Sequence, residues 1–403
     1  MLRRPVDISM DNRRLGNPAS KWAWTAGVVG VAGLGAGVLI GVLTDEGINR
    51  FLSAYLVNYM YFLSLGLGAL FFVILQHLTR SGWSVVIRRL AETVARNMLL
   101  LALLCLPVLL GLGRLYSWAD PETASTNHLL HWKRPYLNST FFILRVIAYF
   151  AVWVWLARYF FNNSVLQDRT GDVGLTVRMQ KVSAPAMVAY AITITFAGFD
   201  LLMSLDPYWY STIFGVYFFS GGLVGFLGLL ALMAFAVQRS GRLTHAITSE
   251  HFHDMGKLIF AFVVFWGYIA FSQYMLIWYA DIPEETSWYL VRQSGDWAWV
   301  SLALLAGHFF VPFLVLISRY PKRRKNLLVL AAVWVLVMHW LDVYWLVMPA
   351  ASSQRVPLHL LDFTCFVGIG GLYFAATVYR LRDCSLIPER DPRLSESLAF
   401  ENV

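Results

Sequence analysis

Long apolar runs restrict what this 403-residue chain can fold into more than any other feature. A helix needs about 20 consecutive apolar residues to cross a bilayer. Backbone polar groups in lipid must find partners within the chain, which leaves helices and closed barrels, and the alternating pattern of barrel strands is missing here. Ten apolar segments stand out, at 22–43, 51–78, 97–115, 139–161, 182–205, 212–237, 258–279, 298–317, 326–348 and 357–379. The sequence therefore predicts an all-α polytopic membrane protein with ten transmembrane helices.

Charged residues are scarce and unevenly placed. They make up 14% of the chain, against about 25% in soluble domains. Of the 32 Lys and Arg residues, 25 fall on one side of the predicted spans, six on the other and one, Arg145, within a span. The side rich in basic residues is normally cytoplasmic, and an even number of spans brings both termini to one side. The sequence predicts a cytoplasmic segment at 1–21, a membrane domain at 22–379 and a cytoplasmic tail at 380–403.

Several classes of function are excluded by motifs that the sequence lacks. The net charge of +8 is split among short loops, so we expect no nucleic-acid partner. The three cysteines, Cys105, Cys365 and Cys384, form neither a CxxC pair nor a haem-attachment motif. His308 is placed near the middle of its span, and His339 and His359 nearer the outside, so no pair at matched depth suits b-type haem. We expect no metal, no cofactor and no catalytic residue on this chain.

Two segments carry packing or surface signals. Residues 83–97 are basic and amphipathic, which fits either a helix in the cytoplasmic interface or a simple continuation of the third span. Glycines recur in the first and sixth spans, where small residues let helices approach closely in lipid. We expect these glycines to serve helix packing; they are Gly33, Gly37, Gly41, Gly221, Gly222, Gly225 and Gly228.

A charged side chain inside a span requires a compensating partner or a function, because its insertion into the membrane costs roughly 2.5–3.5 kcal/mol. Arg145 lies in the fourth span and Asp200 near the outer end of the fifth. The two are candidates for a buried ion pair, which would reduce the penalty for both. Such a pair either fixes helix register alone or takes part in proton movement.

Histidines and carboxylates recur at helical spacing in the later spans. His339 and Asp342 are three residues apart in the ninth span and share a helix face, and His359 with Asp362 repeats this spacing at the start of the tenth. Imidazole–carboxylate pairs can relay protons, and interfacial polar clusters are the alternative. The candidate proton path comprises Asp200, Gln273, His308, His339, Asp342, His359, Asp362, His253, Asp254 and Lys257.

The path as predicted has two halves. An outer set of residues near the ninth and tenth spans is joined to an inner set, which includes His251 and His253, through the midplane residues His308 and Gln273. A midplane interhelical hydrogen bond and a solvated inner loop are the simpler interpretations of the same residues. The path requires that His308 does not face lipid. It also requires that apolar packing does not separate His308 from both the outer and the inner set.

Three separated segments resemble one known family. They are LDPYWYSTIFGVYFF at 205–219, HDMGKLIFAFVVFWGYIAFSQYMLIWYADIPEET at 253–286 and HWLDVYWLVMP at 339–349. The chain is similar, from about the second span to the tenth, to the polysulfide-reductase-type (NrfD-like) integral membrane subunits of alternative complex III, and most to the smaller of the two. The resemblance implies two four-helix bundles, from spans two to five and six to nine, flanked by the first and last spans.

The resemblance also implies a function. Such complexes, in the bacterial inner membrane, oxidise quinol and pass electrons through an iron–sulfur protein and c-type cytochromes to cytochrome c or directly to a terminal oxidase. The implied partners are those subunits and a sister NrfD-like subunit, which would carry the haem and iron–sulfur clusters. Quinone is a candidate ligand at Tyr208, Trp209 and Tyr210, although aromatic belts at the membrane interface give the same pattern. Proton translocation is a further expectation.

Two other classes of protein stay open. A free-standing secondary transporter would show Gly/Pro-interrupted helices at matching positions of its two halves, and we find no such pair in the sequence. A pure scaffold subunit would carry neither protons nor quinone.

Overall fold

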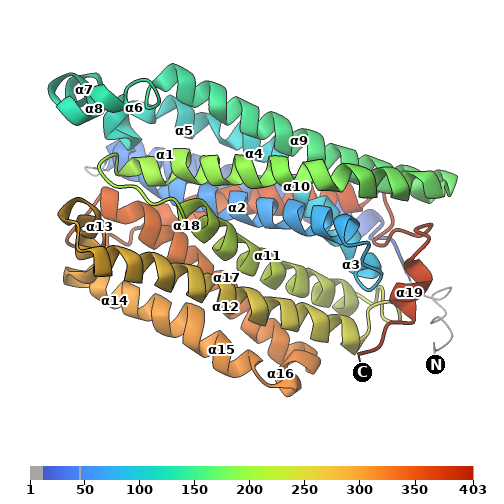
Figure 1. Cartoon of the computed structure of the whole chain (residues 1–403). Helices are drawn as coiled ribbons and strands as arrows, with labels where there is room; N and C mark the ends of the chain where they lie inside the picture. Colours follow the sequence, from blue (N-terminus) through green and yellow to red (C-terminus); the bar gives the residue numbers. More distant parts are fainter. Residues whose placement is uncertain (1–11, 45–46, 403) are drawn as a thin grey trace.

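The described part of the chain is helical throughout. The computed structural model describes residues 12–44 and 47–402, and these residues form helices and no strand (Figure 1). Residues 1–11 of the predicted N-terminal segment lie outside the described residues. The all-α prediction is confirmed.

Ten helical segments in the described residues are long and apolar enough to cross a bilayer, and each overlaps one predicted span. The spans, in order, are α1 (Asn17–Leu43); α2 (Gly47–Leu78); α3 (Val85–Ala95) with α4 (Met98–Leu104) and α5 (Leu106–Leu110); α9 (Ser139–Thr170); α10 (Val173–Leu201); α11 (Phe214–Arg239); α12 (Ser249–Ala280); α14 (Gly295–Leu304) with η3 (Leu305–Phe310) and α15 (Val311–Leu316); α17 (Lys325–Val347); and α18 (Leu360–Leu381). The chain is therefore a multi-pass membrane protein, as predicted.

Short helices connect the spans. They are α6 (Leu112–Leu115), η1 (Ser117–Ala119), α7 (Pro121–Thr126), α8 (His128–Lys133), η2 (Met203–Leu205), α13 (Pro283–Gln293), α16 (Arg319–Arg323), η4 (Met348–Ala350) and α19 (Leu394–Leu398). Local sequence fixes many of the boundaries. Between α9 and α10, Gly171 takes a left-handed backbone (φ 72°) that ends one helix, and the Asp172 carboxylate accepts from the Gly174 amide to begin the next.

The second span is the centre of the molecule. Nearly every residue of α2 is buried, and the helix packs against α3, α10, α11, α17 and α18. Small residues make the closest of these contacts. A Cβ atom at Gly222 of α11 would lie 3.0 Å from the Ser64 Cβ of α2, and one at Gly68 would lie 2.6 Å from Phe226. The glycines of the sixth span thus let α2 and α11 approach closely, which is the packing role predicted for them.

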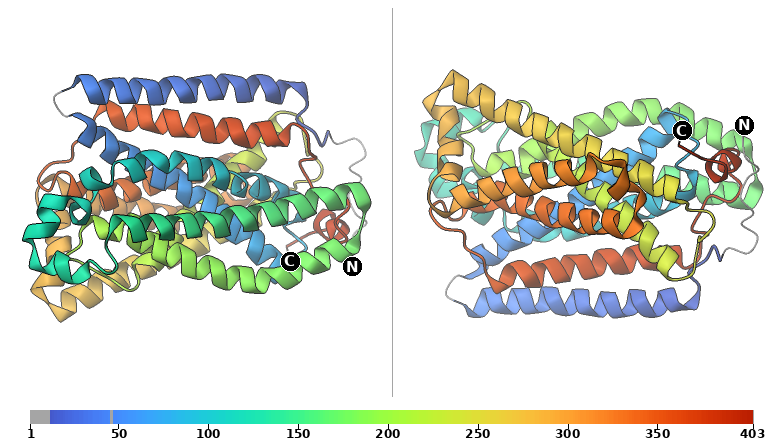
Figure 2. Two further views of the ribbon diagram at one scale, coloured as in Figure 1. Left: turned by 90° about the horizontal axis from the view of Figure 1, so that it is seen from above. Right: turned by 90° about the horizontal axis from the view of Figure 1, so that it is seen from below.

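The first and last spans pair along one edge of the molecule, where Figure 2 shows α1 and α18 side by side. Their contact is between backbones: a Cβ at Gly30 would lie 2.7 Å from the Leu372 nitrogen, and one at Gly33 would lie 2.9 Å from the Gly368 nitrogen. Most of α1 outside this seam is exposed, as expected for a helix that faces lipid.

Residues 83–97 continue into the third span. All eleven residues of α3 are buried, and only Arg96 and Asn97 separate α3 from α4. An interfacial helix would keep its polar face in water, so the interfacial interpretation is wrong. The polar residues instead form a buried charge network, in which Arg88 and Arg89 both pair with Glu92.

The C-terminal tail completes this network. Asp391 pairs with Arg88, and Ser397 of α19 bonds to the backbone on either side of the start of α3, accepting from the Val86 amide at 3.3 Å and donating to the Trp83 carbonyl at 2.6 Å. The tail also meets the N-terminal segment, because the Leu386 amide donates to the Arg13 carbonyl at 2.8 Å. The beginning of α1 and the helix α19 therefore lie at the same end of the molecule (Figure 1).

Candidate functional site

A polar cluster lies in the interior of the later spans. His339 and Asp342 of α17 are both buried, and their side chains point toward α2 and α11. The Asp342 carboxylate accepts from the Tyr217 hydroxyl of α11 and, at 3.3 Å, from the Trp266 indole of α12. The His339 Nε2 atom lies 2.7 Å from the Ser64 hydroxyl of α2. The predicted pair of the ninth span thus joins four spans.

His308 belongs to the same cluster. Its ring is fully buried, with ring centres 4.1 Å from Trp266 and 6.3 Å from His339. Both ring nitrogens of His308 and the Nδ1 atom of His339 are buried without a hydrogen-bond partner in the described part of the chain. Buried polar groups are nearly always paired, so three free imidazole nitrogens beside a carboxylate are the most unusual feature of the interior.

A π-helical turn presents His308. The turn η3 interrupts the eighth span, and such turns are frequent at functional sites. It frees the Gly307 carbonyl, which accepts from the Trp334 indole at 2.7 Å. A Cβ at Gly307 would lie 2.6 Å from Met338, so only glycine lets the turn approach α17 this closely. The sequence analysis missed the turn, although Gly307 directly before a midplane histidine was an available signal.

Glycines of α11 make room for the cluster. A Cβ at Gly225 would lie 2.6 Å from the His339 ring, and one at Gly221 would lie 3.0 Å from Asp342. These glycines therefore shape the site as well as the packing.

The placement of His308 and His339 corrects one part of the sequence analysis. The two rings are neighbours, with centres 6.3 Å apart, which is closer than the predicted depths suggested. Depth counted in residues from predicted helix ends ignores the tilt of the helices. Trp266 packs on one ring and the α11 backbone packs on the other, so the protein itself occupies the sides of both rings.

Gln273 extends the cluster toward the end of the molecule opposite the termini. It lies seven residues beyond Trp266 on α12, or about 10 Å along the helix. Its amide oxygen accepts from the Ser211 hydroxyl at 2.9 Å, and its amide nitrogen donates to the Tyr289 hydroxyl at 2.9 Å. Gln273 therefore does not touch His308, and Trp266 separates the two predicted midplane residues.

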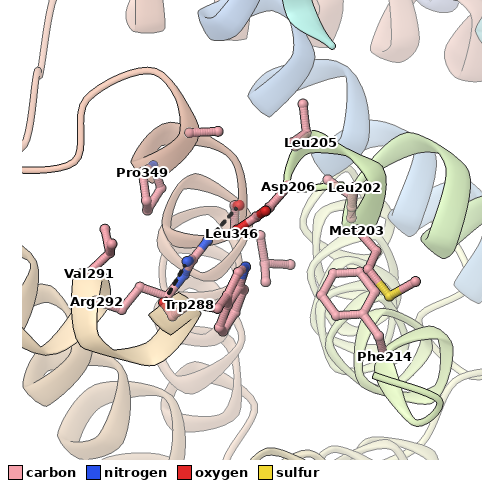
Figure 3. A pocket seen from close by; sticks show the side chains of 11 residues that line it. Leu202, Met203, Leu205, Asp206, Phe214, Trp288, Val291, Arg292, Leu346 and Pro349 are labelled. Carbon is pink, nitrogen blue, oxygen red and sulfur yellow. Dashed lines mark hydrogen bonds between the residues drawn. The ribbon is translucent and has the colours of Figure 1, made fainter. Parts of the chain in front are cut away.

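A buried arginine that the sequence analysis did not single out lies beyond Gln273. Arg292 of α13 donates to the backbone carbonyls of Trp288, Trp345 and Leu346, and its guanidinium lies 3.3 Å from the centre of the Trp288 ring. It borders a pocket of about 70 Å³ whose other wall includes Asp206 (Figure 3). Only the fold brings these segments together, so no local motif marks Arg292.

The predicted quinone contacts separate. Trp209 turns inward, stacks on Trp288 with ring centres 4.3 Å apart and donates to the Glu285 carbonyl. Tyr210 is exposed and, with Trp209, lines a mainly apolar pocket of about 310 Å³ beside α8 and α10. Tyr208 does not line this pocket, and its hydroxyl accepts from the Asn127 amide at 2.7 Å.

Asp200 belongs to a different site. Its carboxylate accepts two hydrogen bonds from Arg145, at 2.8 and 2.9 Å, and one from the Tyr149 hydroxyl at 2.7 Å. The Arg145 guanidinium also lies over the Tyr136 ring. The Asp200 side chain is thus bonded to Arg145 and Tyr149 of the fourth span, so Asp200 belongs to the fourth and fifth spans rather than to the cluster of His308 and Asp342.

The second predicted His–Asp pair caps a helix. The His359 ring nitrogen accepts from the Leu361 amide, and Asp362 accepts from the His359 amide, which is a reciprocal cap at the start of α18. Asp362 also pairs with Arg50 of α2. These residues are therefore held by structural bonds, away from the central cluster.

The inner set lies at the start of α12. Asp254 and Lys257 form an ion pair at 2.5 Å, and Lys257 also donates to Asn402 of the tail. His253 is buried with both ring nitrogens unpaired among the described residues. The 13 residues from His253 to Trp266 span about 20 Å.

The side of α12 that faces the protein between the inner set and the cluster is apolar. Met255, Ile259 and Val263 lie on it and are fully buried. The structure therefore separates the inner set from the cluster by apolar packing, whereas the polar residues at Gln273 lie nearer to it.

Comparison with known proteins adds no assignment: no family model matches the chain, and no curated protein does.

Proposed function

We propose that this chain is a proton-conducting membrane subunit of a quinol-oxidising respiratory complex of the alternative complex III type. The observation that carries the proposal is the buried cluster of His308, His339 and Asp342, in which three imidazole nitrogens have no partner among the described residues. An ionisable group inside a membrane is costly and marks an ion or proton pathway by default. A purely structural histidine would use its ring nitrogens in hydrogen bonds.

The chemistry of the cluster suits proton transfer. A free ring nitrogen can accept a proton, and the opposite nitrogen can then release one. Asp342 accepts hydrogen bonds from the Tyr217 hydroxyl and the Trp266 indole, which orient its carboxylate. We place the loading site at Asp342 and His339, with His308 as the next carrier.

Access to the cluster is asymmetric. The polar residues Ser211, Gln273 and Tyr289 form the outer approach. The inner approach is closed by Met255, Ile259 and Val263. Hydrophobic constrictions gate by exclusion and entry of water, so we propose that this segment is the gate and opens during turnover.

The helix pairings support the arrangement implied by the family resemblance. The second span packs on the third and fifth, and the fourth on the fifth; the sixth packs on the seventh and ninth. We propose two bundles, from spans two to five and six to nine, joined through α2 and α11 and flanked by α1 and α18. The excess of basic residues supports cytoplasmic termini, and the respiratory role supports the bacterial inner membrane.

Electrons travel in partner subunits under this proposal. An iron–sulfur protein and c-type cytochromes hold the redox centres, a sister NrfD-like subunit adjoins this one, and cytochrome c or a terminal oxidase receives the electrons. A quinone ring fits the pocket lined by Trp209 and Tyr210, whose walls are mainly apolar.

The first test is purification. The chain, tagged and extracted in mild detergent, is expected to bring down haem-stained subunits with quinol-oxidising activity. A chain that comes out alone and colourless, under conditions that keep other respiratory complexes intact, would favour the free-standing transporter. Against that alternative, the third span is interrupted at Cys105 and the eighth at the π-helical turn η3, but the backbone stays helical at both places (Cys105 φ −74°, ψ −20°).

The second test addresses protons. Asp342→Asn and His308→Phe are introduced into the complex, which is reconstituted in vesicles with a pH-sensitive dye. We expect quinol oxidation to continue and proton translocation to be lost. The matched controls are Asp281→Asn and His131→Gln, which alter exposed residues; Asn tolerates the left-handed backbone of Asp281 (φ 47°). If proton translocation is unchanged in both cluster variants, the chain is a scaffold subunit that does not conduct protons.

A further inference from the structure

Three arginines meet at the end of the molecule that holds the termini. Arg96 lies between α3 and α4, Arg158 on α9 and Arg380 near the end of α18. The charge of Arg96 repels that of Arg158, and it also repels that of Arg380. In the described part of the chain, none of the three pairs with a carboxylate. Together they are the arginine trio.

The carboxylates near the trio are engaged elsewhere. Asp383, three residues after Arg380, pairs with Arg382 at 2.8 Å. Glu92 lies one helical turn before Arg96, at a spacing that normally allows a pair, but it is buried between Arg88 and Arg89. Asp168, on the same helix as Arg158, pairs with Arg89 at 2.7 Å. The trio is therefore a patch of positive charge that the protein does not neutralise.

Arg380 of the trio is also held in place. Asn97 is fully buried, and its amide nitrogen donates to the Thr377 hydroxyl at 2.7 Å and to the Tyr373 carbonyl at 3.2 Å. Its amide oxygen accepts from the Arg380 guanidinium through Nη1. This bond orients Arg380 and uses only one of its three nitrogens.

An apolar stripe begins at Arg96. The residues that follow on the same helical face are Leu99, Leu103, Leu106 and Leu110, which are 39%, 59%, 52% and 87% exposed. The helix α4 packs against α2, α9 and α18, so the stripe lies on its remaining side, between α9 and α18. Arg96 directly precedes the apolar part of the third span and Arg380 directly follows that of the tenth, which places both at the boundary of the membrane.

We propose that an anionic phospholipid binds here, with its phosphate between Arg96, Arg158 and Arg380 and an acyl chain along the exposed leucines of the third span. Arginine forks suit phosphate oxygens, and basic pockets at the ends of transmembrane helices bind acidic lipid head groups. The leucine stripe distinguishes this ligand from a soluble anion, because a soluble anion has no acyl chain to pack on it. The site is independent of the proton path.

The test uses the full chain, with the subunits that accompany it, in neutral detergent. Native mass spectrometry and thermal unfolding are recorded with added phosphatidylglycerol, phosphatidylcholine or inorganic phosphate. We expect phosphatidylglycerol to bind at least about tenfold more tightly than phosphatidylcholine and to raise the unfolding temperature. The paired substitution Arg96→Gln with Arg158→Gln removes this preference, whereas Arg178→Gln, at an exposed arginine of α10, retains it.

Folding of the variant can be checked separately. Because the charges of Arg96 and Arg158 repel each other, the paired substitution is expected to unfold at the same or a higher temperature than the parent when no lipid is added. Equal binding of the two phospholipids would overturn the proposal. The proposal would also be overturned if millimolar phosphate shifted the unfolding temperature as much as phosphatidylglycerol does, because that would indicate a soluble anion. Cross-linking of the trio to an acidic segment of a partner subunit would overturn it as well.

Discussion

Breaking the Arg145–Asp200 pair is expected to destabilise the protein strongly. Asp200 is fully buried and accepts three hydrogen bonds, while the Arg145 side chain is 10% exposed. Asp200→Asn keeps the size of the side chain but leaves the guanidinium without a counter-charge. Removing one member of a buried pair costs about 3–5 kcal/mol. Because Arg145 keeps the Tyr136 carbonyl and ring, we expect the lower end, about 3 kcal/mol.

The free energy of unfolding is measured in detergent for Asp200→Asn, Arg145→Gln and the double variant. With both charges removed no ion is left unpaired, so the double variant is expected within about 1 kcal/mol of the parent. The reasoning is refuted if Asp200→Asn alone costs less than about 1 kcal/mol, the value typical of exposed pairs, or if the double variant costs as much as the two single variants together.

The same variants decide the role of the pair. If Arg145 and Asp200 only fix the register of the fourth and fifth spans, the stable double variant will translocate protons at the parental rate. If Asp200 carries protons, translocation will be lost although stability is restored.

Three further predictions concern other parts of the chain. Gly225→Ala forces a methyl group against the His339 ring, so it is expected to cost about 1–3 kcal/mol of stability and to reduce proton translocation. The control Gly35→Ala, whose new methyl group meets no atom within 4 Å, is expected to be neutral. Equal unfolding temperatures of the two variants would contradict this. Gly171→Ala is expected to cost about 1–2 kcal/mol, because its backbone is left-handed, and Gly171→Asn less, as thermal unfolding will show. Burial raises the pKa of the Cys384 thiol, so a smaller fraction of this thiol is thiolate at pH 8. Maleimide is therefore expected to label Cys384 at least about tenfold faster after denaturation than in the folded protein. Equal labelling rates would contradict the burial of Cys384.

Hydropathy was sufficient to predict the fold class because the bilayer imposes length and backbone satisfaction on every span. It could not decide residues 83–97. A buried polar network and an interfacial helix require the same amphipathic pattern, and the difference lies in Asp391, some 300 residues away, which supplies the counter-charge for Arg88.

The candidate site shows the same division. The spacing of His339 and Asp342 correctly places both on one helix face, but the identical spacing of His359 and Asp362 forms a helix cap, because His359 is the N-cap residue of α18. The position of the pair relative to the helix start was a usable signal. Arg292 had none, since two of its three carbonyl partners, Trp345 and Leu346, lie on α17, which only the folded arrangement brings near.

The tail has a consequence for biosynthesis. Arg88 lies in the third of the ten spans in the described residues, and its partner Asp391 follows the tenth, so all ten spans are synthesised before the two can meet. Until then Arg88 is left with Glu92, which it shares with Arg89, whereas Arg89 also has Asp168. A ribosome that stops early, at any codon before Asp391, would release a membrane-inserted product with this defect. The third span therefore reaches its final set of ion pairs only after the tenth has been synthesised.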